Sequence, residues 1–271
     1  MNPNSVGIIG VLAILMVILS MLFLIMPMNT IQNEKKPDKL EQIMARGTIV
    51  IATDPESSPF SELIPGSNRN VSSRCHPSQY TRNQFTGFDV AVGCEIADRL
   101  GVEPCFVTPA WTRIVSGDWA DSWDISVGSM TITYERMNDL YFTQPYNSAP
   151  AYVFVRDDQK RYQRPEDLNG KRIGVCAGCA QEAYLKGMLH VPGYNVSYRI
   201  KNAIPVAYNY EAIAFADLSS NSLNKLDAII SDAPIGMQAV RSGMPVRPLH
   251  DPVYFSYFSA ALDKKSLSDP I

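Results

Sequence analysis

Two of the five cysteines, Cys176 and Cys179, form a C-x-x-C sequence directly after the short apolar run IGV. This spacing is found in thiol–disulfide redox pairs, in zinc half-sites and in local disulfides. A structural zinc site needs four ligands, and the sequence contains no second C-x-x-C and no close Cys/His pair. A thioredoxin-like pair begins a helix, whereas Cys176 falls near a strand end and only Cys179 near a helix start. We therefore expect no metal and no cofactor here.

The other reactive side chains form no catalytic motif. His76, His190 and His250 are scattered, and none stands in a motif with an acid or a nucleophile. The sequence also lacks G-x-S-x-G, H-E-x-x-H and phosphate-loop motifs. We expect a protein that is not an enzyme.

Two charged residues stand where strands are expected to end. Arg136 lies at a predicted helix start, where its guanidinium offers a planar pair of donors to a carboxylate. Asp232 follows the apolar strand LDAIIS, and open α/β sheets bind ligands at the carboxyl ends of their strands. Each residue has an alternative role. Arg136 can pair with Glu135 or Asp139 on a solvated face, and Asp232 can cap the helix that begins near Pro234.

Strands alternating with helices must position these side chains. Thr48–Ala52 is β-rich and apolar, GFDVAVGCEIADRLG has helical spacing, and further strand–helix pairs follow residue 150. Repeated β-α-β units predict mainly parallel sheets covered by helices. The composition is that of an ordinary globular protein, with 46% hydrophobic residues and a net charge of −3. With no basic excess, nucleic acid is not an expected partner.

The N-terminus differs from the rest of the chain. Val6–Met28 runs 23 residues without a charge, which is long enough to cross a hydrocarbon layer of ~30 Å as a helix. It lacks a charged region on its N-terminal side and a clear A-x-A cleavage site, so we favour an uncleaved membrane anchor over a signal peptide. Lys35, Lys36 and Lys39 follow it, a charge pattern that argues weakly against export.

Three blocks in order resemble the bacterial extracellular solute-binding proteins of family 3, the polar amino acid transport type. They are RGTIVIATDPESSPF, GFDVAVGCEIADRLG followed by WDISVGSMTITYERMNDLYFTQPY, and DLNGKRIGVCAGCAQEAY followed by LDAIISDAPIG. The resemblance implies a type II periplasmic-binding fold, with two α/β lobes joined by two crossing strands around a ligand cleft. We predict a signal or anchor helix and linker at residues 1–39, a first lobe at 40–149 that residues 250–271 rejoin, and a second lobe at 150–249. The end at DKKSLSDPI suggests that the last helices of the first lobe are missing.

The resemblance also assigns roles to residues. Arg136, Ser129 and Thr131 match the carboxylate-binding positions, and Asp232 matches the ammonium-binding acid. Trp111 matches an aromatic that lies against the ligand side chain, with a core position as the alternative. Asp54 would face the cleft and favour a basic or polar ligand, or else cap the turn that D-P begins.

The C-x-x-C stretch aligns with the second-lobe loop that meets the ligand. There Cys179 occupies a small polar slot and Gln181 opens the helix beside the cleft. A local disulfide is the minor alternative. Among Cys75, Cys94 and Cys105 a further disulfide is possible outside the cytoplasm. Ala180 and Ser57 depart from the family pattern, which leaves the identity of the amino acid open.

The resemblance implies a protein that binds an amino acid at the periplasmic or extracellular face of the membrane. Its partners would be the membrane subunits of an ABC importer, with the membrane itself contacted through the N-terminal helix. The alternatives are an anchored sensor domain for a signalling protein and, with less support, a same-fold enzyme such as a dehydratase.

Overall fold

A computed structural model describes residues 38–220 and 226–265. They belong to one compact unit that begins at Pro37. The expected anchor Val6–Met28 lies outside the described residues. Within the described ranges, no helix is both long and apolar enough to cross a membrane.

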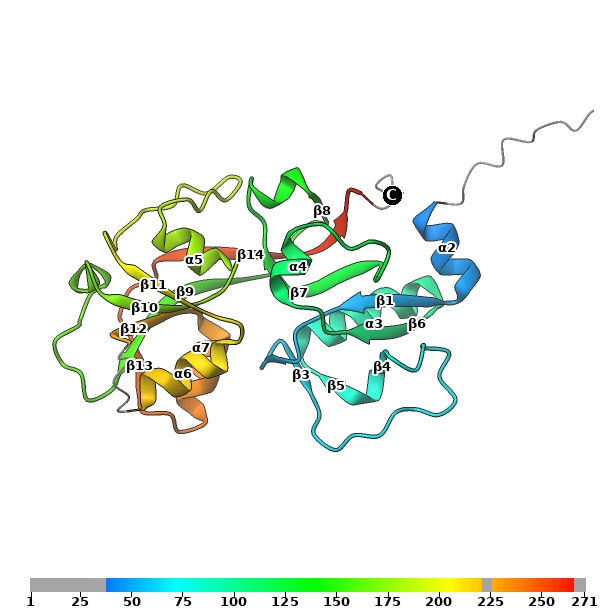
Figure 1. Ribbon diagram of the computed structural model, residues 1–271, viewed down its shortest axis with the longest axis horizontal. Coiled ribbons are helices and arrows are strands. Elements are labelled where there is room, and N and C mark those ends of the chain that lie inside the picture. The colour runs from blue at the N-terminus through cyan, green and yellow to red at the C-terminus, as the bar shows by residue number, and fades with distance from the viewer. Residues whose placement is uncertain (1–37, 221–225, 266–271) are drawn as a thin grey trace, which may run out of the picture. The chain divides into compact units, whose positions relative to one another are not determined.

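One continuous sheet runs through the unit, with a central strand order of β11-β10-β12-β9-β14-β7-β1-β6-β4. It contains two parallel groups, β1 with β6 and β7 in the first lobe and β10 with β11 and β12 in the second. Strands β9 and β14 join the groups by antiparallel pairing with each other and with β12 and β7. They are the two expected crossing strands, and in Figure 1 they run between the second lobe on the left and the first lobe on the right.

The elements of the first lobe are α2 (Lys39–Arg46), β1 (Thr48–Ala52), β2 (Glu56–Ser57), β3 (Ser61–Leu63), β4 (Tyr80–Thr81), η1 (Arg82–Gln84), β5 (Phe85–Thr86), α3 (Phe88–Leu100), β6 (Glu103–Val107), α4 (Trp111–Val115), β7 (Ile125–Thr131), η2 (Arg136–Asn138) and β8 (Leu140–Phe142). The crossing strands are β9 (Asn147–Arg156) and β14 (Tyr254–Asp263). The second lobe contains η3 (Pro165–Leu168), β10 (Arg172–Cys176), α5 (Ala180–Leu185), β11 (Ile204–Tyr208), α6 (Glu211–Ser219), β12 (Ala228–Asp232), α7 (Ala233–Arg241) and β13 (Val246–Pro248).

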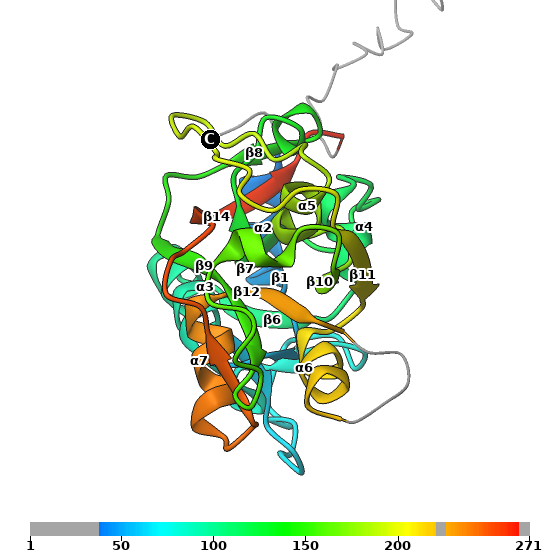
Figure 2. The same cartoon turned by 90° about the vertical axis from the view of Figure 1, so that its left-hand side faces the viewer.

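Strand alternation divides each lobe core between the two faces of the sheet. In β1, Ile49 and Ile51 pack in the cluster that contains α3, and Val50 and Ala52 pack in the cluster that contains α4. In the second lobe one face packs on α5 and the other on α6 and α7. Figure 2 shows α5 above the strands of this lobe and α6 and α7 below them. Because helices cover both faces of the sheet, the parallel strands are unbroken apolar runs in the sequence.

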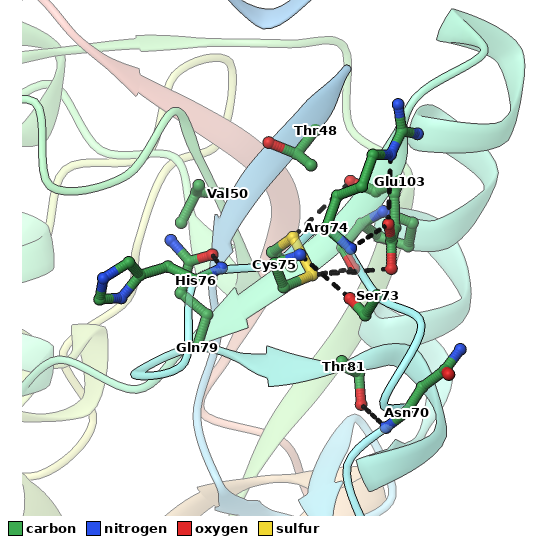
Figure 3. Close-up of a disulfide and its surroundings, with 12 residues drawn as sticks. Thr48, Val50, Asn70, Ser73, Arg74, Cys75, His76, Gln79, Thr81 and Glu103 are labelled. Atoms are coloured by element: carbon green, nitrogen blue, oxygen red, sulfur yellow. Dashed lines mark hydrogen bonds and ion pairs between the residues drawn. A yellow bond between two sulfur atoms is a disulfide. The ribbon is translucent and has the colours of Figure 1, made fainter. Parts of the chain in front are cut away.

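The long polar loop after β3 is tied to the sheet by a disulfide. Cys75 bonds to Cys105 of β6, while Cys94 is a buried free thiol. Beside this disulfide, Glu103 accepts from the Arg74 backbone N–H, and Thr81 Oγ1 accepts from the N–H of Asn70 (Figure 3). The sequence leaves a disulfide among Cys75, Cys94 and Cys105 possible, and the structure identifies the pair as Cys75–Cys105.

The structure also shows the C-x-x-C pair as a disulfide, Cys176–Cys179. The minor alternative of the sequence analysis is therefore the one present. The same two cysteines line the cavity between the lobes, so the pocket-wall and disulfide interpretations hold together. The lobe limits at residues 149/150 and 249/250 remain a prediction, because β9 and β14 run across the junction.

Candidate functional site

All eight residues that the sequence nominates for a ligand site line one cavity between the lobes. They are Asp54, Trp111, Ser129, Thr131, Arg136, Cys179, Gln181 and Asp232. The cavity, with its open mouth, encloses about 610 Å³. Each of these residues stands at or just after the carboxyl end of a parallel strand, β1, β6, β7, β10 or β12, where open α/β sheets bind ligands.

Arg136, which we call the cationic pole, is buried at 8% exposure in the short η2 helix after β7. Its Nη1 donates to the carbonyl of Thr131 at 2.7 Å and its Nη2 to the carbonyl of Gly178 at 2.9 Å. Its guanidinium also lies over the Trp111 ring, 5.6 Å from the ring centre. Among the described residues it forms no ion pair with a carboxylate, so the alternative pairing with Glu135 or Asp139 is absent. A buried cation without a counter-ion favours the binding of an anionic ligand group.

Asp232, the anionic pole, ends β12 and is 6% exposed. Its carboxylate accepts from Gln181 Nε2 at 3.0 Å and from Ser256 Oγ at 2.9 Å. It stands at the N-cap position of α7, but its side chain makes no capping hydrogen bond. Because a carboxylate has about four lone-pair sites, these two bonds leave acceptor capacity for a ligand ammonium.

Glu211, which the sequence analysis missed, is a further acid on the second-lobe side of the cavity. It begins α6, directly after β11, and its carboxylate accepts from Ser231 Oγ. Burial raises the pKa of Glu211 to about 8, and the neighbouring charges of Asp232 and Asp54 contribute. The sequence gives only a weak signal for it, the short stretch IPVAY, which ends directly before the cavity-lining residues Asn209 and Tyr210.

Asp54 faces Glu211 from the first lobe. Its Oδ1 accepts from the Glu56 N–H at 2.7 Å, so it caps the turn after β1 and also lines the cavity. Burial raises its pKa above the ordinary value. The two alternatives for Asp54 are thus compatible, and acids of both lobes meet across the cleft.

Ser129 and Thr131 both line the cavity, but they do not act as a pair of free hydroxyl donors. The Ser129 hydroxyl donates to Asp89 Oδ2 at 2.8 Å, and Tyr146 donates to the other oxygen of Asp89. Ser129 has a left-handed backbone with φ of 49°, and its N–H donates to Tyr146 Oη at 3.0 Å. Thr131 orients Arg136 through its carbonyl. Thr131 therefore supports the cationic pole, and Ser129 shapes the cavity wall through its bonds to Asp89 and Tyr146.

The ligand-free acids predict a pH dependence of stability. Burial raises the pKa of Asp232 to about 7 and that of Glu211 to about 8, from ordinary values of 3.8 and 4.5. The folded state then holds protons that the unfolded state has lost between pH 4.5 and 8. The free energy of unfolding must fall as pH rises through that window. We expect the ligand-free melting temperature to be a few degrees lower at pH 8.5 than at pH 5.5. Each loss of ~1 kcal/mol in the free energy of unfolding lowers the melting temperature by about 2–4 °C for a domain of this size.

Thermal unfolding of the wild type and the Glu211→Gln variant across this range measures the effect. The glutamine cannot titrate, so the variant should show a smaller change. An equal change in both proteins would place the titration elsewhere, for example at Asp89, where burial raises the pKa to about 6.

The family model of bacterial extracellular solute-binding proteins, family 3, matches residues 70–263. The chain belongs to this family. Among curated relatives of this solute-binding protein, the lysine/arginine/ornithine-binding periplasmic protein of Escherichia coli is 25% identical over 185 residues. That alignment covers 68% of this chain and 60% of the relative. The L-arginine-binding protein of Pseudomonas aeruginosa is 28% identical over 150 residues, covering 55% of this chain and 53% of the relative. The chain thus spans little more than half the length of these relatives.

Solved structures show the same fold. The arginine-bound form of truncated ArgBP from T. maritima superposes with a TM-score of 0.65 at 23% identity, covering 83% of this chain and 92% of that one. An ancestral amino acid-binding protein, a precursor of cyclohexadienyl dehydratase, gives a TM-score of 0.66 at 26% identity, covering 84% and 87%. The expected two-lobed type II fold is therefore confirmed.

Proposed function

We propose that this solute-binding protein binds an α-amino acid with a cationic side chain in the inter-lobe cleft. One observation carries the proposal: a buried guanidinium that pairs with no carboxylate among the described residues lies in a cavity lined by four acids, Asp54, Glu56, Glu211 and Asp232. A ligand carboxylate would bind Arg136 as a forked hydrogen-bonded pair. Its ammonium would bind Asp232, and a second cation would lie between Asp54 and Glu211. Relatives named for lysine, arginine and ornithine support this class.

A neutral side chain would fit this charge pattern less well. Among the described residues that line the cavity, the acids outnumber the one cation, Arg136. Burial raises the pKa of both Glu211 and Asp232, and the charges of Asp232 and Asp54 raise that of Glu211 further. Trp111 supplies an apolar wall for the ligand's aliphatic stem, since it lines the cavity beside Arg136. The role is non-catalytic, in keeping with relatives that are named as binding proteins.

A ligand panel tests the proposal. The melting temperature of the full chain is measured at pH 8 with each common amino acid and with ornithine. At a ligand concentration 100 times Kd, binding stabilises by about 2.7 kcal/mol. We expect increases of about 5–10 °C with L-arginine, L-lysine or L-ornithine. If no amino acid raises the melting temperature, the proposed function is wrong.

Replacing Glu211 with glutamine tests the choice of a cationic side chain. We expect Kd for L-arginine to rise at least about tenfold, since a hydrogen-bonded charge pair contributes about 1.5–3 kcal/mol. L-citrulline, the neutral isostere of arginine, should bind as well as before or better. Calorimetric titration with both ligands gives the ratio. Glu56→Gln is the matched control, because Glu56 is an exposed acid at the cavity lining. Equal losses of affinity for both ligands would show that Glu211 does not distinguish a charged ligand side chain from a neutral one.

We further propose that the protein acts outside the cytoplasm and delivers its ligand to the membrane subunits of an ABC importer. The lysine/arginine/ornithine-binding relative is named as a periplasmic protein, and two disulfides suit an oxidising compartment. Uptake of labelled arginine by a deletion strain should be restored by the wild-type chain and not by an Arg136→Ala variant. Full restoration of arginine uptake by the Arg136→Ala variant would show that transport does not depend on the cleft.

A further inference from the structure

The Cys176–Cys179 disulfide closes a four-residue turn between β10 and α5 on the wall of the ligand cavity. The N–H of Cys179 donates to the carbonyl of Cys176 across this turn at 3.2 Å. Within the turn, the N–H of Ala177 donates to the carbonyl of Tyr208 at the end of β11. The turn is therefore fixed both by its covalent bond and by the neighbouring strand.

The turn reaches the cationic pole in the opposite lobe. The carbonyl of Gly178 accepts from Nη2 of Arg136 at 2.9 Å. Gly178 has a left-handed backbone with φ of 73° and packs against α4, where an added Cβ would lie 3.5 Å from Thr112 and 3.8 Å from Trp111. The direction of one half of the guanidinium fork thus depends on where this turn holds its carbonyl.

The same turn reaches the anionic pole. Cys179 is the residue before α5, and Gln181 in the first turn of α5 donates from Nε2 to Asp232 Oδ2 at 3.0 Å. Gln181 is buried at 3% exposure, so its side chain has little room to adjust if the helix start shifts. One short covalent ring therefore sets partners of both Arg136 and Asp232.

We propose that the Cys176–Cys179 disulfide is a positioning element for both poles, so that affinity for the amino acid depends on its redox state. This inference rests on the proposed function. Opening the ring releases the Gly178 carbonyl and the start of α5, and the two poles lose their preset spacing. A site held in advance binds more tightly than one that must be ordered on binding.

Of the two disulfides in the described part of the chain, Cys176–Cys179 is the more accessible to a reductant. Cys179 is half-buried at the cleft, whereas Cys75 and Cys105 are 5% and 0% exposed. An external dithiol supplies the two electrons. Its thiolate attacks Sγ of Cys179, the Sγ–Sγ bond breaks, and Cys176 leaves as a thiolate that takes a proton. The second thiol of the reductant then displaces Cys179, which also takes a proton, and the reductant departs as a cyclic disulfide.

Calorimetric titration of the full chain with L-arginine at pH 8 tests the inference, before and after treatment with dithiothreitol. We expect Kd to rise about tenfold or more on reduction, equivalent to 1.4 kcal/mol, and to recover on reoxidation. The Cys176→Ser/Cys179→Ser variant should show the weaker Kd with and without reductant. The Cys75→Ser/Cys105→Ser variant, which lacks only the distant disulfide, should respond like the wild type.

Thermodynamic linkage provides a second measurement, the effect of ligand on the redox equilibrium of the disulfide. A disulfide with a merely structural role would show no such effect. If oxidation tightens binding by some factor, saturating L-arginine must make Cys176–Cys179 harder to reduce by the same factor in a dithiol redox buffer. Equal Kd values before and after reduction, or a redox equilibrium that L-arginine does not shift, would overturn the inference while leaving the proposed function intact. If the oxidised chain binds no amino acid at all, both fail.

Discussion

An Arg136→Ala variant is expected to lose binding of every α-amino acid, with Kd rising roughly 30-fold to several thousand-fold. The range corresponds to the 2–5 kcal/mol that truncating one member of a buried hydrogen-bonded charge pair costs. Arg136→Lys keeps the charge but loses the planar fork, so we expect it to recover only part of the affinity. Titration calorimetry with L-arginine measures both variants.

Arg113 offers a matched control for Arg136. It lies over the Trp123 ring at 5.0 Å, as Arg136 lies over Trp111, but it does not line the ligand cavity. Arg113→Ala should leave Kd within about twofold, since surface substitutions are usually within ±0.5 kcal/mol. An Arg136→Ala variant that binds as well as the Arg113→Ala variant would refute the role of the guanidinium.

An Asp232→Asn variant is expected to bind about 30- to 150-fold more weakly, a loss of about 2–3 kcal/mol for a charge-assisted hydrogen bond. The asparagine keeps the shape and can accept from Gln181 while donating to Ser256. At pH 8 the ligand-free variant should nevertheless melt higher than the wild type, because burial raises the pKa of Asp232 to about 7 and its ionised form is disfavoured. Weaker binding with higher stability is the signature of a group held for function.

Calorimetry and thermal unfolding at pH 8 give the two quantities for Asp232→Asn. Ser256→Ala, which removes one hydrogen bond to the same carboxylate, serves as the comparison. If Asp232→Asn lowers both affinity and melting temperature, Asp232 is a structural residue, and the ammonium must bind elsewhere.

Sequence reasoning identified most of the cleft because its residues follow strands with strong apolar signals. Arg136 follows β7 and Asp232 ends β12, and both strands are buried over most of their length. Buried parallel strands are unbroken apolar runs, so their carboxyl ends can be located from sequence.

Glu211 escaped because its strand carries no such signal. In β11 the residues of IPVAY are exposed or half-buried, as expected for a strand at one end of the sheet order. A polar segment without a helix precedes it, so the pattern gives little warning of a strand. The Cys176–Cys179 disulfide was only the minor alternative in the sequence analysis, for another reason. Connectivity depends on three-dimensional proximity, which spacing alone does not establish.

The hydrogen bond of the Ser129 hydroxyl is another feature that the sequence pattern could not predict. Its position in the motif placed it correctly at the cavity, but its proton is directed to Asp89, on a helix far away in sequence. Burial of Asp89 and the bonds from Ser129 and Tyr146 form a support behind the wall. Such support comes from helix packing and cannot be derived from a local pattern.

A crystal structure of the protein with L-arginine tests the central claim most directly. The account predicts a carboxylate bonded to the guanidinium of Arg136 within about 2.7–2.9 Å, an ammonium on Asp232, and the side-chain cation between Asp54 and Glu211. An amino acid bound in the reverse orientation, or outside the cavity that these residues line, would contradict it.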